Sequence, residues 1–218
     1  MKKIVELKNA TVQVNNGLDE VKTILDDVNL TIYEHDFLTI LGGNGAGKST
    51  LFNVIAGTLM LTSGKIYILG KDVTNLPRGE KRGLLPRKIH HFTDEFKTLV
   101  ARTGNGLEKH LDTPTGLLSG GQRQALSLLM ATLKRPELLL LDEHTAALDP
   151  KTSVSLMNLT DEFVTGDELT ALMITHHMED ALKYGNRLIV MKDGKIIKDL
   201  NQEEKAQMAI ADYYQLFE

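Results

Sequence analysis

The stretch GGNGAGKST, from Gly42 to Thr50, fits the pattern G-x-x-x-x-G-K-[ST] with Gly42, Gly47, Lys48 and Ser49. A loop of this kind turns its backbone N–H groups toward phosphate oxygens, and the helix after it adds the positive end of its dipole. Glycines are needed because side chains would clash with the ligand or forbid the backbone angles. The strand pattern FLTIL before the loop and the helical pattern after it favour this interpretation over a chance glycine-rich turn.

The loop predicts a nucleoside triphosphate as ligand. Lys48 is expected to reach the outer phosphates, and the Ser49 hydroxyl is expected to bind Mg²⁺. The predicted nucleotide-binding residues of this loop are Gly42, Gly43, Asn44, Gly45, Ala46, Gly47, Lys48, Ser49 and Thr50.

Strand and helix patterns alternate on both sides of the loop, which predicts an α/β fold with a mainly parallel sheet and an N-terminal antiparallel β subdomain. Expected strands are IVEL, VNLTIY, FLTILG, GKIYILG, ELLLLDE and LTALMITH, and RLIVMKDGKIIKD predicts a hairpin around Asp193-Gly194. Expected helices are KSTLFNVIAGTL, Asp94 to Arg102, Ser119 to about Leu133, and Glu203 to Phe217.

A pair of acids, Asp142 and Glu143, ends the apolar strand ELLLLDE. Parallel strands deliver their last residues to the ligand-binding edge of an α/β sheet. We therefore expect Asp142 to hold Mg²⁺, and Glu143 to orient or deprotonate the attacking water as a catalytic residue. His176 follows the strand LTALMIT, and its imidazole is expected to hydrogen-bond the γ-phosphate or the water; a purely structural histidine is the alternative.

Composition excludes several classes of protein. The 218 residues include 25 Lys and Arg against 29 Asp and Glu, so the net charge of −4 gives no basic surplus for nucleic acid. The absence of cysteine excludes disulfides and thiolate metal sites. We expect a soluble protein without a signal peptide, because no apolar run approaches the roughly 20 residues that span a bilayer.

A second glycine turn, LSGGQ from Leu118 to Gln122, precedes a long helical pattern. With the phosphate loop, LLLLDE, AALD and ITH in this order, the chain resembles the ATP-binding cassette (ABC) family, the ATPase subunits of ABC transporters, over nearly its whole length. The resemblance implies an ATP hydrolase with a P-loop NTPase core and ATP and Mg²⁺ as cofactors.

In that family the signature LSGGQ contacts ATP held by a second cassette. The resemblance therefore implies a homodimer through ATP, in which Ser119, Gly120, Gly121 and Gln122 contact the partner's γ-phosphate and Asp149 lies at the dimer seam. It further implies a separate transmembrane permease, a substrate-binding protein, and a cytoplasmic location, peripheral on the cytoplasmic face of the membrane.

Two further stretches, LLLLDEHTAALDP and YGNRLIVM, resemble a bacterial importer branch for small nutrients, with amino acids as candidates. His144 stands where many cassettes have a proline. Val14 stands where the family has an aromatic residue that stacks on adenine, so a weaker apolar contact with the base is expected.

The chain is also shorter than the family pattern. Lys48 and Ser119 are 71 residues apart, several dozen fewer than expected, and the glutamine that normally contacts Mg²⁺ is missing after about Pro77. The resemblance divides the single domain into residues 1–75 (β subdomain and phosphate-loop core), 76–118 (a shortened helical lobe) and 119–218 (the rest of the core). The segment between about Pro77 and Leu84 is deleted, or is present in the molecule but not in this sequence, or is replaced by a divergent lobe.

Two alternative functions stay open at the level of sequence. One is a nucleotide-binding module with impaired hydrolysis or coupling, because the segment with the glutamine is missing. The other is an ABC ATPase without a transport role, which usually carries long insertions or two cassettes. If the loss is real, ATP binding should survive, because Gly42 to Ser49 is intact, and coupling to a permease should be impaired.

Overall fold

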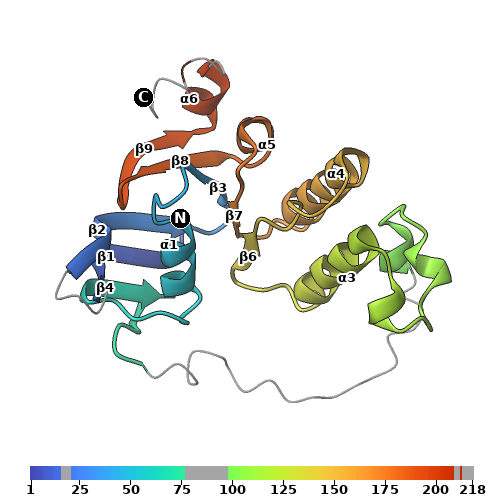
Figure 1. Ribbon diagram of the computed structural model, residues 1–218, viewed down its shortest axis with the longest axis horizontal. Helices are drawn as coiled ribbons and strands as arrows, with labels where there is room; N and C mark the ends of the chain where they lie inside the picture. The colour runs from blue at the N-terminus through green and yellow to red at the C-terminus, as the bar shows by residue number, and fades with distance from the viewer. Residues whose placement is uncertain (16–20, 77–97, 209–211, 213–218) are drawn as a thin grey trace.

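The computed structural model describes residues 1–15, 21–76, 98–208 and 212, and these residues build two sheets (Figure 1). The first is antiparallel with the order β2-β1-β4-β5, and the second has the order β6-β7-β3-β8-β9. The strands of the first sheet are β1 (Lys3–Asn15), β2 (Val21–Tyr33), β4 (Ser63–Ile68) and β5 (Lys71–Asp72). Those of the second are β3 (Phe37–Gly42), β6 (Leu139–Asp142), β7 (Ala171–Ile174), β8 (Arg187–Lys192) and β9 (Lys195–Asn201).

Strand β3 lies at the centre of the second sheet and runs parallel to both of its neighbours, β7 and β8. Strand β6 is parallel to β7, and Ile174 lies level with both Ile40 and Asp142. The carboxyl ends of β3, β6 and β7 therefore meet at one edge of the sheet. The segments that directly follow these three strands, including the phosphate loop after β3, therefore start at this edge.

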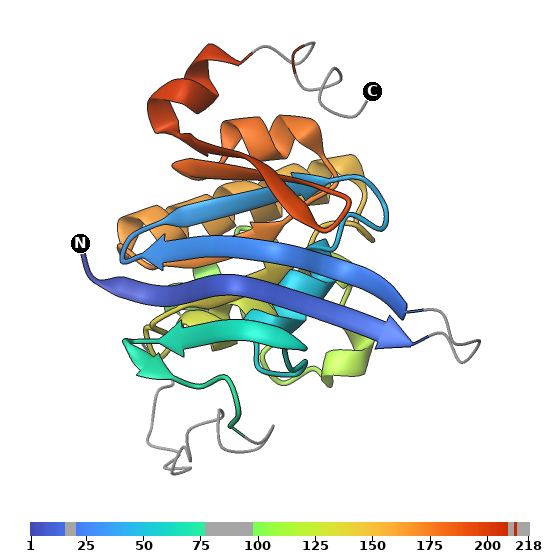
Figure 2. The ribbon, with the colours of Figure 1, turned by 90° about the vertical axis from the view of Figure 1, so that its left-hand side faces the viewer.

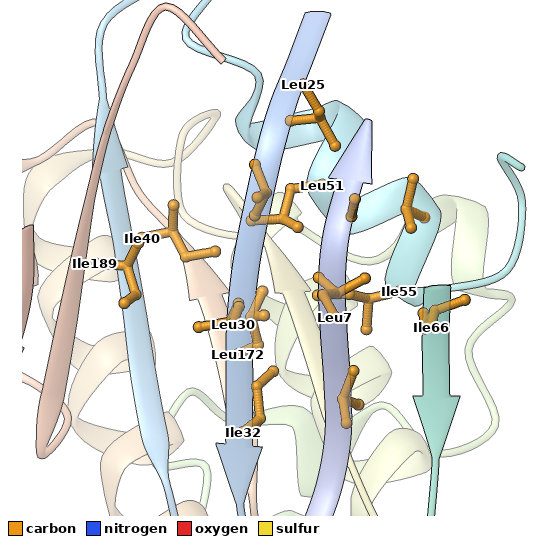
Figure 3. Packing of buried hydrophobic residues seen from close by; sticks show 14 of the residues in the cluster. Leu7, Leu25, Leu30, Ile32, Ile40, Leu51, Ile55, Ile66, Leu172 and Ile189 are labelled. Atoms are coloured by element: carbon orange, nitrogen blue, oxygen red, sulfur yellow. The ribbon is translucent and has the colours of Figure 1, made fainter. Parts of the chain in front are cut away.

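Helix α1 (Lys48–Ile55) is buried between the two sheets, where a hydrophobic core forms (Figure 3). Leu51 and Ile55 of α1 pack among side chains from both sheets, including Leu7, Ile66 and Leu172. Leu51 is fully buried. Since full burial of such a side chain contributes about 1.5–3 kcal/mol, this core fixes α1, and with it the loop that α1 follows.

The opposite face of the second sheet is covered by α3 (Gly120–Thr132) and α4 (Pro150–Gly166). Phe163 of α4 is among the largest fully buried side chains. Two short helices, α5 (Met178–Lys183) and α6 (Gln202–Gln207), lie beside β8 and β9 (Figure 2). Two 3-10 turns, Leu107–Lys109 and Thr115–Leu117, precede α3.

Most of the predicted elements are confirmed. The predicted hairpin is present as β8 and β9, and its turn residues Asp193 and Gly194 both have positive φ, as a two-residue hairpin requires. The predicted helix ending before GNG is helical at residues 98–101, and its earlier part lies outside the described residues.

Two expectations about helices were wrong or incomplete. The helix predicted from Glu203 to Phe217 is present as α6 up to Gln207, where Met208 has extended backbone angles; beyond Met208 the structure describes only Asp212. Helices α4 and α5 were not predicted. The shortened segment after about Pro77 lies outside the described residues.

Candidate functional site

The phosphate loop lies directly between β3 and α1, as its pattern predicts. Gly45 and Gly47 have φ of 80° and 98°, in the left-handed region that favours glycine. No side chain caps α1 at Gly47, which leaves the first N–H groups of the helix to a ligand. These N–H groups and the helix dipole together favour an anion at this end.

Neighbouring backbone clamps the loop from two sides. A Cβ atom on Gly47 would lie 2.8 Å from the carbonyl oxygen of Ile24 in β2, and one on Gly42 would lie 2.6 Å from that of Met191 in β8. The N–H of Gly194, in the β8–β9 turn, donates to the carbonyl of Ala46 at 3.1 Å. The two glycines are thus required by close packing as well as by backbone angle.

A cavity of about 300 Å³ opens over the loop. The ammonium of Lys48 donates to the carbonyl oxygens of Gly42 (2.6 Å) and Gly43 (3.0 Å), which keeps this buried side chain inside the curve of the loop. The cavity is lined by Lys22, Ile24, Asn44, Gly45, Ala46, Gly47, Lys48, Ser49, Thr50, Glu143 and His176. Nine of these eleven residues were predicted as nucleotide-binding or catalytic residues, namely Asn44 to Thr50, Glu143 and His176.

The acidic pair stands at the same edge of the sheet. The N–H of Glu143 donates to the carbonyl of Ile174 at 3.1 Å, which joins the ends of β6 and β7. Glu143 has a left-handed φ of 45°, a strained conformation for a residue with a side chain and one that is common at functional sites. Its carboxylate contacts Nε2 of His176, so the two predicted catalytic side chains form a pair.

The charged groups of the site shift one another's protonation. Burial raises the pKa of Asp142, and the nearby Glu143 carboxylate raises it further, against the opposing effect of His176 and Lys48. Burial lowers the pKa of Lys48, against the opposing effect of the two acids. A bound phosphate would stabilise the charged form of Lys48, and a bound cation would stabilise the charged form of Asp142.

The residues present fit a magnesium ion held jointly with a nucleotide. Ser49 offers a hydroxyl oxygen beside the loop and Asp142 a carboxylate at the same sheet edge, and Mg²⁺ prefers such oxygen ligands. Among the residues that the structure describes, no cluster of three or more His, Cys, Asp or Glu could hold a metal by itself. Mg²⁺ commonly binds through one or two protein groups and the phosphates of its substrate, which agrees with this sparse set.

The signature turn forms the N-terminus of α3. Ser119 is the N-cap: its hydroxyl accepts from the N–H of Gln122 (3.2 Å), and the Gln122 side chain accepts from the N–H of Ser119 (3.0 Å). This capping box fixes the turn. Gly121 is packed so tightly against α4 that a Cβ atom would lie 2.3 Å from Cγ2 of Thr152.

The signature does not line the cavity over the phosphate loop of its own chain. Figure 1 shows α1 and α3 well apart, with β6 between them in the view. Asp149 is exposed and caps α4, where its carboxylate accepts from the N–H of Thr152 at 3.1 Å and this bond lowers its pKa. Ser119 and Asp149 are both exposed and lie outside the cavity, so both are accessible to a second molecule.

Two cavity residues, Lys22 and Ile24 of β2, were not predicted from the sequence. Ile24 is the extra residue of a bulge, because Leu25 pairs with Val12 while Thr23 pairs with Gln13. Val14 is opposite Lys22 in the strand pair and is 40 % exposed, and it does not line the cavity. The signal that could have found Lys22 is its pairing with Val14, which only the strand register reveals.

Two other histidines lie outside the cavity. His110 is exposed. His144 is part-buried, and its Nε2 contacts the hydroxyl of Thr160 at 3.0 Å. Burial lowers the pKa of His144 to about 4.

A glycine-rich loop after the central strand, a helix that starts at its lysine, and a carboxylate pair after a neighbouring strand define a P-loop nucleoside triphosphatase. The comparisons with known proteins specify the family. A family profile described as "ABC transporter" matches residues 25–146. The tyrosine transport ATP-binding protein of Clostridioides difficile is 34 % identical, with 99 % of each chain covered. The chain belongs to the ABC transporter family and is an ATP-binding subunit with ATP hydrolase activity.

Other relatives agree with this assignment. The spermidine/putrescine import ATP-binding protein PotA of Haemophilus ducreyi is 35 % identical over 91 % of this chain, which spans 58 % of that protein. A solved dimeric structure of the ATP-binding cassette MJ0796, in a post-hydrolysis state with ADP and Pi, has a TM-score of 0.75 and 27 % identity, and covers 91 % of this chain and 99 % of that one. In the described part of the chain, no helix is long and apolar enough to cross a membrane.

The alignment with the C. difficile protein also bears on the short stretch after the phosphate loop. It extends over 248 positions, whereas this chain has 218 residues, so at least 30 positions of the alignment have no counterpart here. The chain is therefore shorter than a relative that it matches from end to end.

Proposed function

We propose that this chain energises the import of a small nutrient by binding ATP at the Gly42–Thr50 loop, hydrolysing it, and pairing with a second copy through the nucleotide. The observation that carries the proposal is that the phosphate loop and the signature lie apart within one chain. Asn44 to Thr50 of the phosphate loop and Glu143 line one cavity, while the signature that the family uses for ATP stands apart from it.

The hydrolytic chemistry rests on Glu143 and His176. The Glu143 carboxylate faces the cavity and accepts the proton of a water molecule that attacks the γ-phosphate. His176 contacts this carboxylate and orients it, and its exposed position also lets it reach the γ-phosphate. Mg²⁺ held by Ser49 and Asp142 would neutralise charge that develops on the phosphates.

The second copy completes the site. Ser119, Gly120, Gly121 and Gln122 at the N-terminus of α3 contact the γ-phosphate held by the partner's loop, because the N–H groups at this helix end favour an anion. Asp149, which caps the neighbouring helix α4, lies at the seam between the copies. The dimeric state of the MJ0796 cassette supports this arrangement.

The partners follow from the relatives. They are transport and import ATP-binding proteins, which supports a separate membrane permease and a peripheral position on the cytoplasmic face. We infer a substrate-binding protein as a third component and an amino acid as solute, with tyrosine as the first to test. In this assembly residues 1–75 and 119–218 form the nucleotide-binding core, and residues 76–118 form the shortened lobe that faces the permease.

The alternatives have less support. A nucleotide-binding module without turnover would have no need of the Glu143–His176 pair, which the structure holds at the cavity. An ABC ATPase outside transport would have relatives of other names than the transport and import proteins found.

The proposal is tested by light scattering of a Glu143→Gln variant with and without Mg-ATP. Removal of the carboxylate should trap the ATP-bound dimer, so ATP should shift the protein from monomer to dimer. In the same background, Ser119→Asp should abolish the shift. Aspartate still caps the helix, so α3 is preserved, but its charge repels the partner's γ-phosphate.

Ser127→Asp is the matched control, because Ser127 is an exposed residue of α3 outside the signature. It adds the same charge to the same helix and should leave the dimer intact. A monomer that binds ATP but never dimerises, or a dimer that tolerates Ser119→Asp, would refute the exchange of signatures between copies.

A further inference from the structure

Lys22 is a cation at the nucleotide cavity that the hydrolytic chemistry does not use. It lies on β2, is exposed, and lines the cavity together with Ile24 and residues Asn44 to Thr50 of the phosphate loop. Within the described residues Lys22 has no hydrogen-bond or ion-pair partner, unlike Lys48, whose ammonium is bound to two loop carbonyls. Its charge is therefore available to a ligand in the cavity.

The side of the cavity formed by β2 offers little that distinguishes one base from another. Ile24 is an apolar contact without a hydrogen-bonding side chain, and Val14, paired opposite Lys22, is also aliphatic. No aromatic side chain lines the cavity within the described part of the chain. An aliphatic contact lacks the stacking interaction with the base that an aromatic ring supplies.

The other groups that line the cavity favour the binding of phosphate. Lys48, the N–H groups of the loop and the N-terminus of α1 all favour an anion, and Lys22 adds a second ammonium at the rim. A nucleoside triphosphate carries several negative charges whichever base it bears, so these groups act on all nucleotides alike.

We propose that this site selects the triphosphate rather than the base, with Lys22 as an affinity-determining residue that contacts the phosphate–ribose part of the nucleotide. The inference rests on the proposed function and deepens it. The substrate class becomes nucleoside triphosphates in general, with purine and pyrimidine nucleotides accepted alike.

Binding of ATP, GTP, CTP and UTP to the full chain, measured by calorimetry with Mg²⁺, tests the proposal. The four affinities should agree within roughly fivefold, because no base stacking separates them. Inorganic tripolyphosphate, which has neither base nor ribose, should displace each of them. Lys22→Ala should weaken all four by a similar factor of roughly fivefold, as expected for an exposed charge pair.

Lys71→Ala is the matched control. Lys71 is an exposed lysine of β5, at the edge of the same sheet opposite to β2, and it does not line the cavity. This variant should bind all four nucleotides as the unchanged protein does. Val14→Tyr should create selectivity, with ATP and GTP binding roughly tenfold more tightly than before because a ring next to Lys22 stacks best on the larger bases.

The outcomes separate this inference from the proposed function. If ATP binds more than tenfold better than the other three nucleotides, or if Lys22→Ala binds as Lys71→Ala does, the inference is overturned while the ATPase assignment stands. If none of the four nucleotides binds, the phosphate site itself is misassigned and both proposals fail together.

Discussion

His144 shows how a single residue in the catalytic region can affect stability without taking part in the chemistry. It directly follows Glu143, yet its ring points to Thr160 of α4, whose hydroxyl in turn donates to the carbonyl of Leu156. The imidazole thus links the strand β6 region to α4. Burial favours its neutral form, which lowers its pKa to about 4.

This pKa predicts how stability depends on pH. Between about 4 and the unfolded value near 6.5, the unfolded chain binds the proton and the folded chain does not, so stability falls as pH falls through this window. The loss should be on the order of 1.5 kcal/mol between pH 6.5 and pH 5. His144→Gln, which can still hydrogen-bond Thr160 but does not titrate, should remove that part of the pH dependence. Urea unfolding of both proteins at the two pH values measures the free energy of unfolding. If both proteins lost the same free energy between pH 6.5 and pH 5, the prediction would be contradicted.

At the scale of elements, the contact between α3 and α4 sets the position of the signature. Gly121 is buried in this contact, and an added Cβ would lie 2.3 Å from Cγ2 of Thr152. The N–H of Thr152 also donates to the carboxylate of Asp149, which caps α4. Thr152 therefore joins the N-termini of α3 and α4 into one unit. The exposed Ser119 and Asp149 are presented on that unit.

Gly121→Ala should therefore destabilise the protein by about 1–3 kcal/mol, as overpacking of a tight contact does. Thr152→Ser removes the clashing methyl group, so the double variant should recover most of the loss. Gly120→Ala is the control, since its Cβ would lie 3.3 Å from the end of the Leu148 side chain and should cost less. A double-mutant cycle measured by denaturant unfolding tests this, and additive effects would refute a direct contact between positions 121 and 152.

At the scale of the whole molecule, nucleotide binding and the proposed contact with a permease depend on different parts of the chain. Asn44 to Thr50, Glu143 and His176 line one cavity. Against the C. difficile relative, however, at least 30 alignment positions have no counterpart in this chain. Binding and coupling should therefore separate in this protein.

Intact mass spectrometry decides whether the short lobe belongs to the molecule, since the 218 residues correspond to 24.2 kDa. With that mass, we expect ATP binding but no stimulation of ATP turnover by a reconstituted permease and its solute. A chimera that carries the relative's longer segment after Pro77 is the control and should restore stimulation. Solute-stimulated turnover by the unaltered chain would show that the lobe couples despite its length.

Much of the fold could be predicted from sequence because its signals are local. The central strand, the loop and α1 follow from a short motif, and the β8–β9 hairpin from the turn residues Asp193 and Gly194. Helix α4 was missed because no glycine motif drew attention to it, although Asp149 and Pro150 are a cap and a first helical residue of ordinary type. The break in the tail helix after Gln207 was not predicted, because helical periodicity does not reveal where extended backbone interrupts a helix.

The chemical groups of the predicted site can be recognised locally, because the phosphate loop, the carboxylates after a strand and the signature each consist of a few adjacent residues whose types the chemistry requires. Which of these groups lie together depends on the tertiary structure. Parallel pairing of β3, β6 and β7 brings Lys48, Glu143 and His176 to one edge, while α3 carries Ser119 away from it. The β2 bulge and the strand register add Lys22 to the cavity and leave Val14 beside it. Such placements depend on contacts between residues far apart in the chain, and no local pattern contains them.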